Sequence, residues 1–217
     1  MKKRKGIILA GGLGSRFFPV TNSISKHLLP IFDKPMIYYS LSTLMLADIR
    51  EILIITTARD EKIFKNLLGD GSNYGINFEY LIQESPDGIP QAFILAEDFL
   101  NGSPSLLILG DNFFYGDGLQ KKLLNITKDT NNTTIFGYRV RNPEDYGVIE
   151  FDPSGNIITF HEKPKNFISD IAITGIYFFD ENAPKFSKEL KFSSRGELEI
   201  TDLNKIYLKQ KKLKLEI

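Results

Sequence analysis

Short apolar runs alternate with helix-length patterns along most of the chain, and this alternation favours an α/β fold in which helices pack on a sheet. The apolar runs are rich in Ile, Leu and Phe. We expect strands over Gly6–Ala10, Glu51–Thr57, Ile76–Ile82, Ser105–Leu109, Thr133–Arg139, Gly147–Phe151, Asn156–Phe160 and Ile173–Phe179. We expect helices over Met36–Ala47, Asp60–Leu68, Gln91–Phe99, Gly118–Asp129, Glu181–Leu190 and Glu199–Lys209.

The order of these elements predicts a mixed, Rossmann-like sheet flanked by helices. Strands and helices alternate as β-α-β-α-β-α-β in the first half of the chain. After Thr133 helices are fewer, and a turn at 152–156 separates two alternating runs, which favours an antiparallel lobe in the second half. Residues 212–217 alternate polar and apolar as a half-buried strand does. Because that strand stops without a turn or a cap, we expect either a truncated chain or a short gene product.

Composition excludes several classes of protein. The chain has 217 residues, 42% of them hydrophobic, which suits one domain over 1–217. Lys and Arg number 27, as do Asp and Glu, so no net charge attracts nucleic acid or a membrane surface. There is no cysteine and only two histidines, His27 and His161, which excludes disulfides, thiolate nucleophiles and cysteine-based zinc sites.

The N-terminus is basic but does not predict a signal peptide, because the apolar run that follows it ends at Gly11 and Gly12. No stretch approaches the roughly 20 apolar residues that cross a bilayer. We therefore expect a soluble, cytoplasmic protein.

A glycine-rich segment, residues 9–16, directly follows the first predicted strand. Glycines allow backbone N–H groups to approach a phosphate chain without obstruction by a Cβ atom, so this segment is a candidate phosphate-binding loop. The dinucleotide-binding pattern would need glycine where Phe17 stands, and a P-loop would need Gly-Lys where Arg16 and Phe17 stand. The alternative is a glycine-rich turn without a function.

Two cations, Arg16 and Lys26, lie near this loop in sequence, the second within residues 25–30, Ser-Lys-His-Leu-Leu-Pro. A single lysine is usually a solvated surface residue, and a single histidine is usually structural. Two cations beside one glycine-rich loop nevertheless suit transfer to phosphorus, because that reaction depends on positioning and on stabilising spread negative charge.

These motifs resemble the sugar nucleotidyltransferase family, and within it the glucose-1-phosphate thymidylyltransferases. The matching blocks are residues 9–16, 19–21, 25–30, 33–39, 41–47, 83–88, 91–93, 109–112, 146–148, 162–164 and 195–202. Together they run through essentially the whole chain in family order. The resemblance implies the nucleotidyltransferase fold, of glycosyltransferase-A-like type, as a single domain over 1–217.

The resemblance also implies the reaction. An oxygen of glucose 1-phosphate would attack the α-phosphorus of dTTP, release pyrophosphate and form dTDP-glucose for deoxysugar and cell-surface polysaccharide synthesis. A sugar phosphate is mostly dianionic at neutral pH, so no side-chain nucleophile or general base is needed. The family implies Mg²⁺ as cofactor and a homo-oligomer, a tetramer, as the assembly.

Site residues follow from the same resemblance, position by position. Arg16 and Lys26 would stabilise charge in the transition state, and Asp111 would ligate Mg²⁺. The nucleotide would contact Leu9, Gly11, Gly12, Gly14, Ser15, His27, Gln83, Pro86, Gly88 and Asp111. The sugar phosphate would contact Asn112, Tyr146, Gly147, Glu162, Lys163, Ile173 and Arg195.

For several of these residues the sequence alone permits a plainer interpretation. Gln83 would contact the pyrimidine edge, because an amide offers a donor and an acceptor in one plane, but by itself it could be a surface residue. Asp111 follows a predicted strand, where open α/β sheets bind ligands, but could equally form a turn. Glu162 and Lys163 could be an exposed ion pair.

The sequence departs from the family at three places. His27 stands where the family usually has Gln, and Leu13, Phe17 and Phe18 replace smaller or more polar loop residues. Family members also continue past Ile217 through a Trp-Leu-Asp-Thr-Gly segment whose Asp is a second metal ligand, and into C-terminal helices used in assembly; this chain has no tryptophan. One carboxylate together with substrate phosphates can still hold Mg²⁺.

Three further functions therefore stay open. The chain could be a truncated, catalytically impaired paralogue that binds nucleotides or sugar phosphates, or a related enzyme that uses UTP. An oxidoreductase with a dinucleotide cofactor is disfavoured by Phe17. If the chain is cut short, we expect it to be less stable and less active than a longer relative, because Leu213, Leu215 and Ile217 would leave an open apolar edge.

Overall fold

The computed structural model describes residues 2–12 and 14–217, so the predicted loop substitution at Leu13 lies outside the described residues. Its strands are β1 (Lys5–Leu9), β2 (Pro30–Ile31), β3 (Lys34–Pro35), β4 (Glu51–Thr56), β5 (Asn77–Ile82), β6 (Ser105–Leu109), β7 (Thr133–Arg139), β8 (Gly147–Phe151), β9 (Ile157–Glu162), β10 (Ile171–Phe179) and β11 (Leu213–Glu216). Its α-helices are α1 (Ile37–Leu46), α2 (Glu61–Leu68), α3 (Gln91–Leu95), α4 (Glu97–Leu100), α5 (Leu119–Lys128), α6 (Ala183–Lys188) and α7 (Ile200–Lys209).

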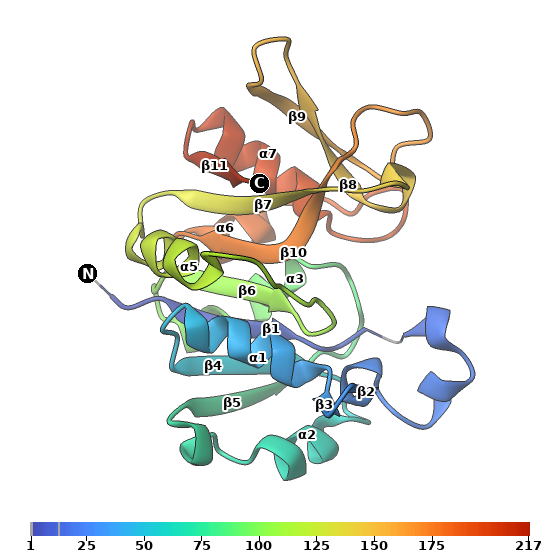
Figure 1. Cartoon of the computed structure of the whole chain (residues 1–217), viewed down its shortest axis with the longest axis vertical. Coiled ribbons are helices and arrows are strands. Elements are labelled where there is room, and N and C mark those ends of the chain that lie inside the picture. Colours follow the sequence, from blue (N-terminus) through green and yellow to red (C-terminus); the bar gives the residue numbers. More distant parts are fainter. Residues whose placement is uncertain (1, 13) are drawn as a thin grey trace.

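One mixed sheet forms the centre of the molecule (Figure 1). Within the described residues its main path runs β11-β7-β10-β6-β1-β4-β5, and the hairpin of β8 and β9 joins it at β10. Neighbours among β6, β1, β4 and β5 are parallel, whereas β10 is antiparallel to both β6 and β7. This confirms the predicted mixed sheet with an antiparallel part in the second half.

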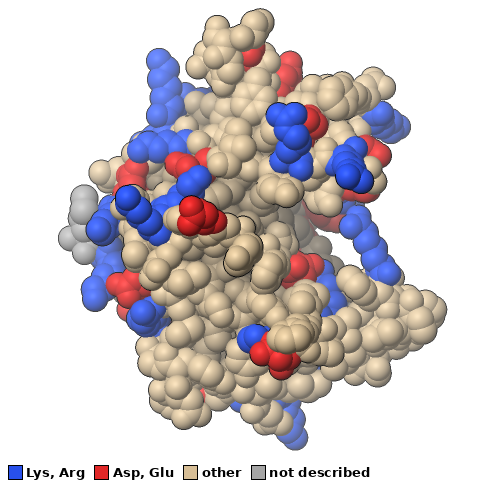
Figure 2. Space-filling model, in the orientation of Figure 1, with Lys and Arg blue, Asp and Glu red and all other residues tan. Residues whose placement is uncertain are grey.

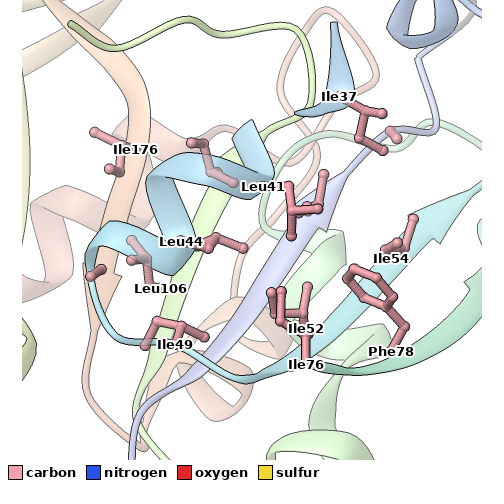
Figure 3. Packing of buried hydrophobic residues seen from close by; sticks show 14 of the residues in the cluster. Ile37, Leu41, Leu44, Ile49, Ile52, Ile54, Ile76, Phe78, Leu106 and Ile176 are labelled. Carbon is pink, nitrogen blue, oxygen red and sulfur yellow. The ribbon is translucent and has the colours of Figure 1, made fainter. Parts of the chain in front are cut away.

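Helices cover both faces of the sheet, because its central strands are apolar on both sides. On one face α1, α2 and α5 pack on side chains such as Ile8, Ile54 and Leu106. Figure 3 shows this packing, with Ile37, Leu41 and Leu44 of α1 lying over the strands. On the other face α3, α4, α6 and α7 pack on the alternate strand residues. The result is a three-layer α/β/α arrangement that holds the strand ends rigidly.

The antiparallel lobe begins where β10 changes its partner. The second half of β10 pairs with β6, through Ile176 opposite Ile108, whereas its first half pairs with β8, through Ala172 opposite Val148. The register of β10 against β7 shifts between Ile173 and Tyr177. Because β6 and β8 diverge here, the stretch of β10 between them borders an opening at the carboxyl end of β6.

Most predicted elements are confirmed to within one or two residues, including the last strand, β11, which pairs in parallel with β7. Three features differ from the prediction. The helix expected over 91–99 is two helices that meet at Ala96, and the short hairpin of β2 and β3 was not expected. Three 3₁₀ turns were also not expected: η1 (Ser15–Phe17) overlaps the end of the glycine-rich segment, and η2 (Val20–Asn22) and η3 (Lys26–Leu28) follow it. None of the described helices is long and apolar enough to cross a membrane.

The buried guanidinium of Arg4 joins the ends of the central strands. It donates to the backbone oxygens of Ser105 at 2.6 Å, Phe179 at 2.7 Å and Asp129 at 2.7 Å. Burial lowers the pKa of Arg4 to about 10, so the group remains charged at neutral pH. An apparently ordinary basic N-terminus therefore contains a residue of the core.

Replacing Arg4 by Met is expected to destabilise the fold by about 2–4 kcal/mol, because buried carbonyls lose a charged donor. Arg50→Met is the matched control, since Arg50 also donates to two backbone oxygens but is more exposed. Urea denaturation measures both variants. Equal and small losses would show that the Arg4 network contributes little.

Candidate active site

The loops that follow β1 and β6 meet at the carboxyl edge of the sheet. The connection after β1 leads to β4 on one side of it, whereas the connection after β6 leads to β7 on the other side. Ligands of open α/β sheets bind where the strand order reverses in this way. The backbone N–H of Gly110 donates to the oxygen of Leu9 at 2.9 Å, which joins the start of the two loops. The predicted phosphate-binding loop and the predicted metal ligand are therefore neighbours in space.

Two glycines of the glycine-rich loop, Gly11 and Gly14, are packed so closely that a side chain would displace a neighbour. A Cβ atom on Gly11 would lie 2.1 Å from Oε1 of Gln83, and one on Gly14 would lie 2.8 Å from the methyl group of Thr21. Gly14 also has a φ of 66°, and Thr21 Oγ1 donates to its backbone oxygen at 2.9 Å. No α-helix starts among residues 14–36, so an anion at this loop would depend on backbone N–H groups and nearby cations instead of on an α-helix dipole.

Lys26 and Asp111 form a partly buried ion pair beside this loop. Lys26 Nζ contacts Asp111 Oδ2, and the amide of Asn112 donates to Asp111 Oδ1 at 3.1 Å. Burial of Asp111 opposes its charge, but the Lys26 hydrogen bond and charge outweigh that effect and hold the pKa of Asp111 below its usual value. Lys26 Nζ is also 3.4 Å from the position of a Cβ on Gly12. The sequence prediction that Lys26 and Asp111 belong to one site agrees with this contact.

His27 points into the protein, which differs from the predicted position beside the phosphates. Its side chain is 1% exposed, its Nδ1 lies 3.0 Å from Ser25 Oγ, and its ring packs against Gly110 and Phe64. Burial, with the charge of Lys26, lowers the pKa of His27 from 6.5 to about 4. The neutral imidazole of His27 therefore packs inside the protein, between the segment that carries Lys26 and the loop at Gly110.

Replacing His27 by Gln is expected to reduce the acid sensitivity of the fold. Between about pH 6.5 and 4 the unfolded chain binds a proton at His27 and the folded chain does not, so stability is complete above pH 6.5 and is lost as the pH falls through this window. Between pH 7 and 4 the wild type should lose up to about 3 kcal/mol more than the variant. Urea denaturation across the pH range measures the difference, and parallel curves would contradict it.

Gln83, the residue predicted to contact a pyrimidine, is buried at the end of β5 and faces the glycine-rich loop. Its Nε2 donates to Oε1 of Gln91, the first residue of α3. Gln91 in turn contacts Asp87 through Nε2, at 2.8 Å from Oδ2. Two residues that the sequence analysis did not assign, Asp87 and Gln91, thus hold Gln83 in place.

Gly88 connects this segment to the loop that precedes α7. It has a φ of 106°, and a Cβ atom there would lie 2.1 Å from the backbone oxygen of Leu198. The N–H of Leu198 donates to the oxygen of Asp87 at 2.7 Å. Gly88 is therefore placed to join two loops. Pro86, in the same segment, is exposed.

A cavity of about 500 Å³ lies where β6 and β8 diverge along β10. All the residues predicted to contact the sugar phosphate line it, together with Arg16: they are Asn112, Tyr146, Gly147, Glu162, Lys163, Ile173 and Arg195. Figure 2 shows this face hollowed between the antiparallel lobe above and the arm of residues 14–35 at lower right, with Lys, Arg, Asp and Glu side chains around the hollow. Residues as far apart in sequence as Arg16 and Ile200 therefore share one cavity.

Charged side chains at this cavity hold one another in place. Arg195 donates to Glu162 at 3.0 Å and to Glu197 at 3.1 Å, and lies 3.5 Å from Glu199. These carboxylates raise the pKa of Arg195 although burial opposes its charge. Burial, with the nearby charge of Glu199, raises the pKa of Glu162. Thr201 also donates to Glu162, at 3.3 Å, so the carboxylate is held from two sides.

Asn112 connects the loop after β6 to the irregular part of β10. Its Oδ1 accepts a hydrogen bond from the N–H of Gly175 at 3.1 Å. A Cβ atom on Gly175 would lie 2.5 Å from that oxygen, so glycine is required there. The same side chain contacts Asp111, which places Asn112 between the Lys26–Asp111 pair and the cavity.

The described residues contain no cluster of three or more His, Asp or Glu side chains that could hold a metal ion by themselves. Asp111, with one carboxylate held at the edge of the sheet, is instead suited to share a cation with a bound phosphate chain. That donor set fits Mg²⁺, which is commonly bound through one or two carboxylates plus substrate phosphates.

Comparison with known proteins agrees with this fold and site. The chain belongs to the nucleotidyl transferase family, whose family model matches residues 5–217. Among its relatives are glucose-1-phosphate thymidylyltransferases from Neisseria gonorrhoeae, at 53% identity, and from Mycobacterium tuberculosis, at 46% identity. Each alignment covers 98% of this chain and 74% of the relative. The resemblance to this group is therefore confirmed.

Solved structures show the same fold. A protein from Bacillus anthracis described as a glucose-1-phosphate thymidylyltransferase aligns with a TM-score of 0.90 at 41% identity, covering 98% of this chain and 86% of that one. A UDP-glucose pyrophosphorylase aligns with a TM-score of 0.82 at 24% identity, covering 100% and 91%, and supports the fold alone.

Proposed function

We propose that this chain transfers a thymidylyl group from dTTP to glucose 1-phosphate, which yields dTDP-glucose and pyrophosphate. The observation that supports this best is the continuity of the site. The glycine-rich loop and the Lys26–Asp111 pair adjoin, through Asn112, a cavity lined by Glu162, Lys163 and Arg195. A nucleotide and a sugar phosphate can thus be held side by side, as the relatives' names require.

The chemistry suits the charges that are present. An oxygen of the sugar phosphate forms a bond to the α-phosphorus while the bond to the pyrophosphate oxygen breaks, and pyrophosphate leaves with that electron pair. Lys26 beside the glycine-rich loop, and Arg16 at the cavity, would balance the negative charge that spreads over the phosphoryl oxygens. Lys163 and Arg195 would hold the attacking phosphate, while Glu162 and Asn112 would orient the sugar.

Asp111 would hold Mg²⁺ together with the triphosphate. When bound, the ion neutralises phosphate charge and polarises the phosphorus centre. In the ligand-free chain Lys26 balances the Asp111 carboxylate, which keeps it ionised and ready to bind a cation. Gln83 and the backbone at Gly88 would contact the thymine.

Pyrophosphate release with dTTP, glucose 1-phosphate and Mg²⁺ tests the proposal, with the sugar nucleotide identified by mass spectrometry. Release that depends on both substrates is the expected result. An impaired binding protein would instead be stabilised by dTTP in a thermal melt and release no pyrophosphate.

UTP is the comparison substrate. A uridylyltransferase is less favoured, because the relatives from Neisseria gonorrhoeae and Mycobacterium tuberculosis are thymidylyltransferases at 53% and 46% identity, whereas the UDP-glucose pyrophosphorylase shares 24%.

A homo-oligomer in the cytoplasm belongs to the same proposal. Nucleoside triphosphates are cytoplasmic metabolites, and the arm of residues 14–35 exposes large apolar side chains, Phe18 at 70% and Phe32 at 97%. A self-associating surface would cover such groups. Light scattering on the purified chain measures its assembly.

A further inference from the structure

The amide of Gln83 lies between the glycine-rich loop and α3. It is 7% exposed; its Oε1 is 2.1 Å from the position that a Cβ on Gly11 would take, and its Nε2 donates to Gln91 Oε1. An amide side chain can rotate by half a turn and exchange its donor and acceptor. Which end faces the nucleotide therefore depends on what holds the other end.

Gln91 has no such freedom, because Asp87 contacts both ends of its amide. The backbone N–H of Asp87 donates to Gln91 Oε1 at 3.2 Å, and Asp87 Oδ2 accepts from Gln91 Nε2 at 2.8 Å. A backbone N–H can only donate and an ionised carboxylate can only accept. Turning the Gln91 amide over would place its Nε2 against the N–H of Asp87, donor against donor, and its Oε1 against the carboxylate of Asp87, acceptor against acceptor.

The carboxylate of Asp87 is itself held. Ser85 Oγ donates to Asp87 Oδ2 at 2.7 Å, and the backbone oxygen of Asp87 accepts from Leu198. Gln91 begins α3, whose next residues, Ala92 and Phe93, are fully buried in the core. The network is therefore anchored to the core through α3. Asp87 fixes the orientation of the Gln91 amide, and Gln91 in turn fixes the orientation of the Gln83 amide.

We propose that Gln91 is a positioning residue that sets the pyrimidine specificity of the site by holding the Gln83 amide in one orientation. Gln83 Nε2 is committed to Gln91, so its Oε1 is presented to the loop where the nucleotide binds. This inference rests on the proposed function, in which Gln83 contacts the base.

The orientation has a chemical consequence. Thymine and uracil carry an N3–H, which donates to a carbonyl oxygen. Cytosine has an unprotonated N3, which would face Gln83 Oε1 acceptor to acceptor. Cytosine would be accepted only if Gln83 turned over, and Gln91 prevents this. Because a buried polar group without a partner is costly, a site built in this way rejects the wrong base strongly.

Gln91→Met and Gln91→Glu separate this role from packing. Methionine keeps the length and shape of the side chain but removes the acceptor. Glutamate keeps the acceptor for Gln83 but would set its second oxygen against Asp87 Oδ2, so it is introduced together with Asp87→Asn, whose amide can donate to it. Gln120→Met, on the exposed surface of α5, is the matched control. For each protein, kcat/KM is measured with dTTP and with dCTP, at saturating glucose 1-phosphate and Mg²⁺, and folding is checked by a thermal melt.

The wild type and the Gln120 control should prefer dTTP strongly. Gln91→Met should reduce the dTTP to dCTP ratio of kcat/KM about tenfold or more, and the double variant Asp87→Asn, Gln91→Glu should keep most of that ratio. A Gln91→Met variant that loses activity equally with both nucleotides, and so keeps the ratio, would overturn the inference in favour of a structural role. A wild type that uses neither nucleotide would instead overturn the proposed function, and the inference with it.

Discussion

Replacing Lys26 by Ala is expected to lower the turnover number for pyrophosphate release by about 10²–10³, while the affinity for dTTP changes far less. Lys26 Nζ lies beside Gly12 and contacts Asp111, so its charge is aimed at the place where the phosphates would bind. That charge is needed most when negative charge spreads in the transition state, and loss of one such group commonly has this effect.

The matched control for this change is Lys34→Ala. Lys34 also forms an ion pair with an aspartate, Asp33, but the pair lies exposed on the β2–β3 hairpin and should contribute little to activity. Single-turnover rates at saturating Mg²⁺, together with dTTP binding by calorimetry, distinguish turnover from binding. A Lys26→Ala enzyme that bound dTTP poorly but kept its turnover would assign the residue to ground-state binding instead.

Removing Lys26 also leaves Asp111 partly buried without its strongest partner, so a second reason for lost activity has to be separated. Burial alone would raise the pKa of the Asp111 carboxylate, and Lys26 opposes this more than any other group. Comparing the pH profiles of Lys26→Ala and Asp111→Asn separates the effects. Recovery of the lysine variant at higher pH would indicate that it acts mainly by keeping Asp111 ionised.

The sequence predicted the sheet well because its strands are buried on both faces. Runs such as residues 52–55 and 105–109 have no competing helical period, and they are long enough to be recognised. The hairpin of β2 and β3 has two residues in each strand, too few for any period to appear. The break at Ala96 leaves the apolar pattern of two short helices nearly continuous.

Side-chain direction in the loops was less predictable. Lys26 and His27 are adjacent in a 3₁₀ turn, where successive residues point about 120° apart. The phase of that turn, set by Ser25 and by packing on Phe64, directs the lysine to Asp111 and the imidazole into the core. No local pattern determines that phase.

Contacts between distant loops also left little trace in the sequence. The cavity residues came from resemblance, because their proximity depends on where β6 and β8 diverge. Asp87 precedes by four positions Gln91, the first residue of a predicted helix, which is a weak signal for a side-chain contact. Their link to Gln83 depends on where the end of β5 lies relative to the start of α3, which only the folded chain defines.

Replacing Gly88 by Ala is expected to impair both stability and activity, because the site has no room for a methyl group. The Cβ atom would lie 2.1 Å from the oxygen and 2.9 Å from the nitrogen of Leu198, both backbone atoms that cannot turn aside. A φ of 106° adds strain for any residue other than glycine. Together these effects should lower the free energy of unfolding by about 3–5 kcal/mol.

Gly155→Ala is the matched control, since Gly155 has a φ of 84° in the β8–β9 turn and nothing lies within 4 Å of its missing Cβ. This substitution should lower the free energy of unfolding by about 1–2 kcal/mol, because only the backbone strain acts, and should leave activity unchanged. Urea denaturation of both variants isolates the contribution of the contact with Leu198. Equal losses in the two variants would mean that the loops separate easily.

The effect of Gly88→Ala on activity follows from what the two loops hold. Residues 83–91 position the Gln83 amide, and residues 193–199 position Arg195 at the cavity, so forcing Gly88 and Leu198 apart should displace both. A shift of about 1 Å in a positioning group can cost about 10² in rate, so kcat/KM should fall by at least that factor for dTTP and for glucose 1-phosphate alike. If kcat/KM fell for dTTP but not for glucose 1-phosphate, the loop before α7 would hold its position independently. The nucleotide and sugar halves of the site would then not be mechanically joined at Gly88.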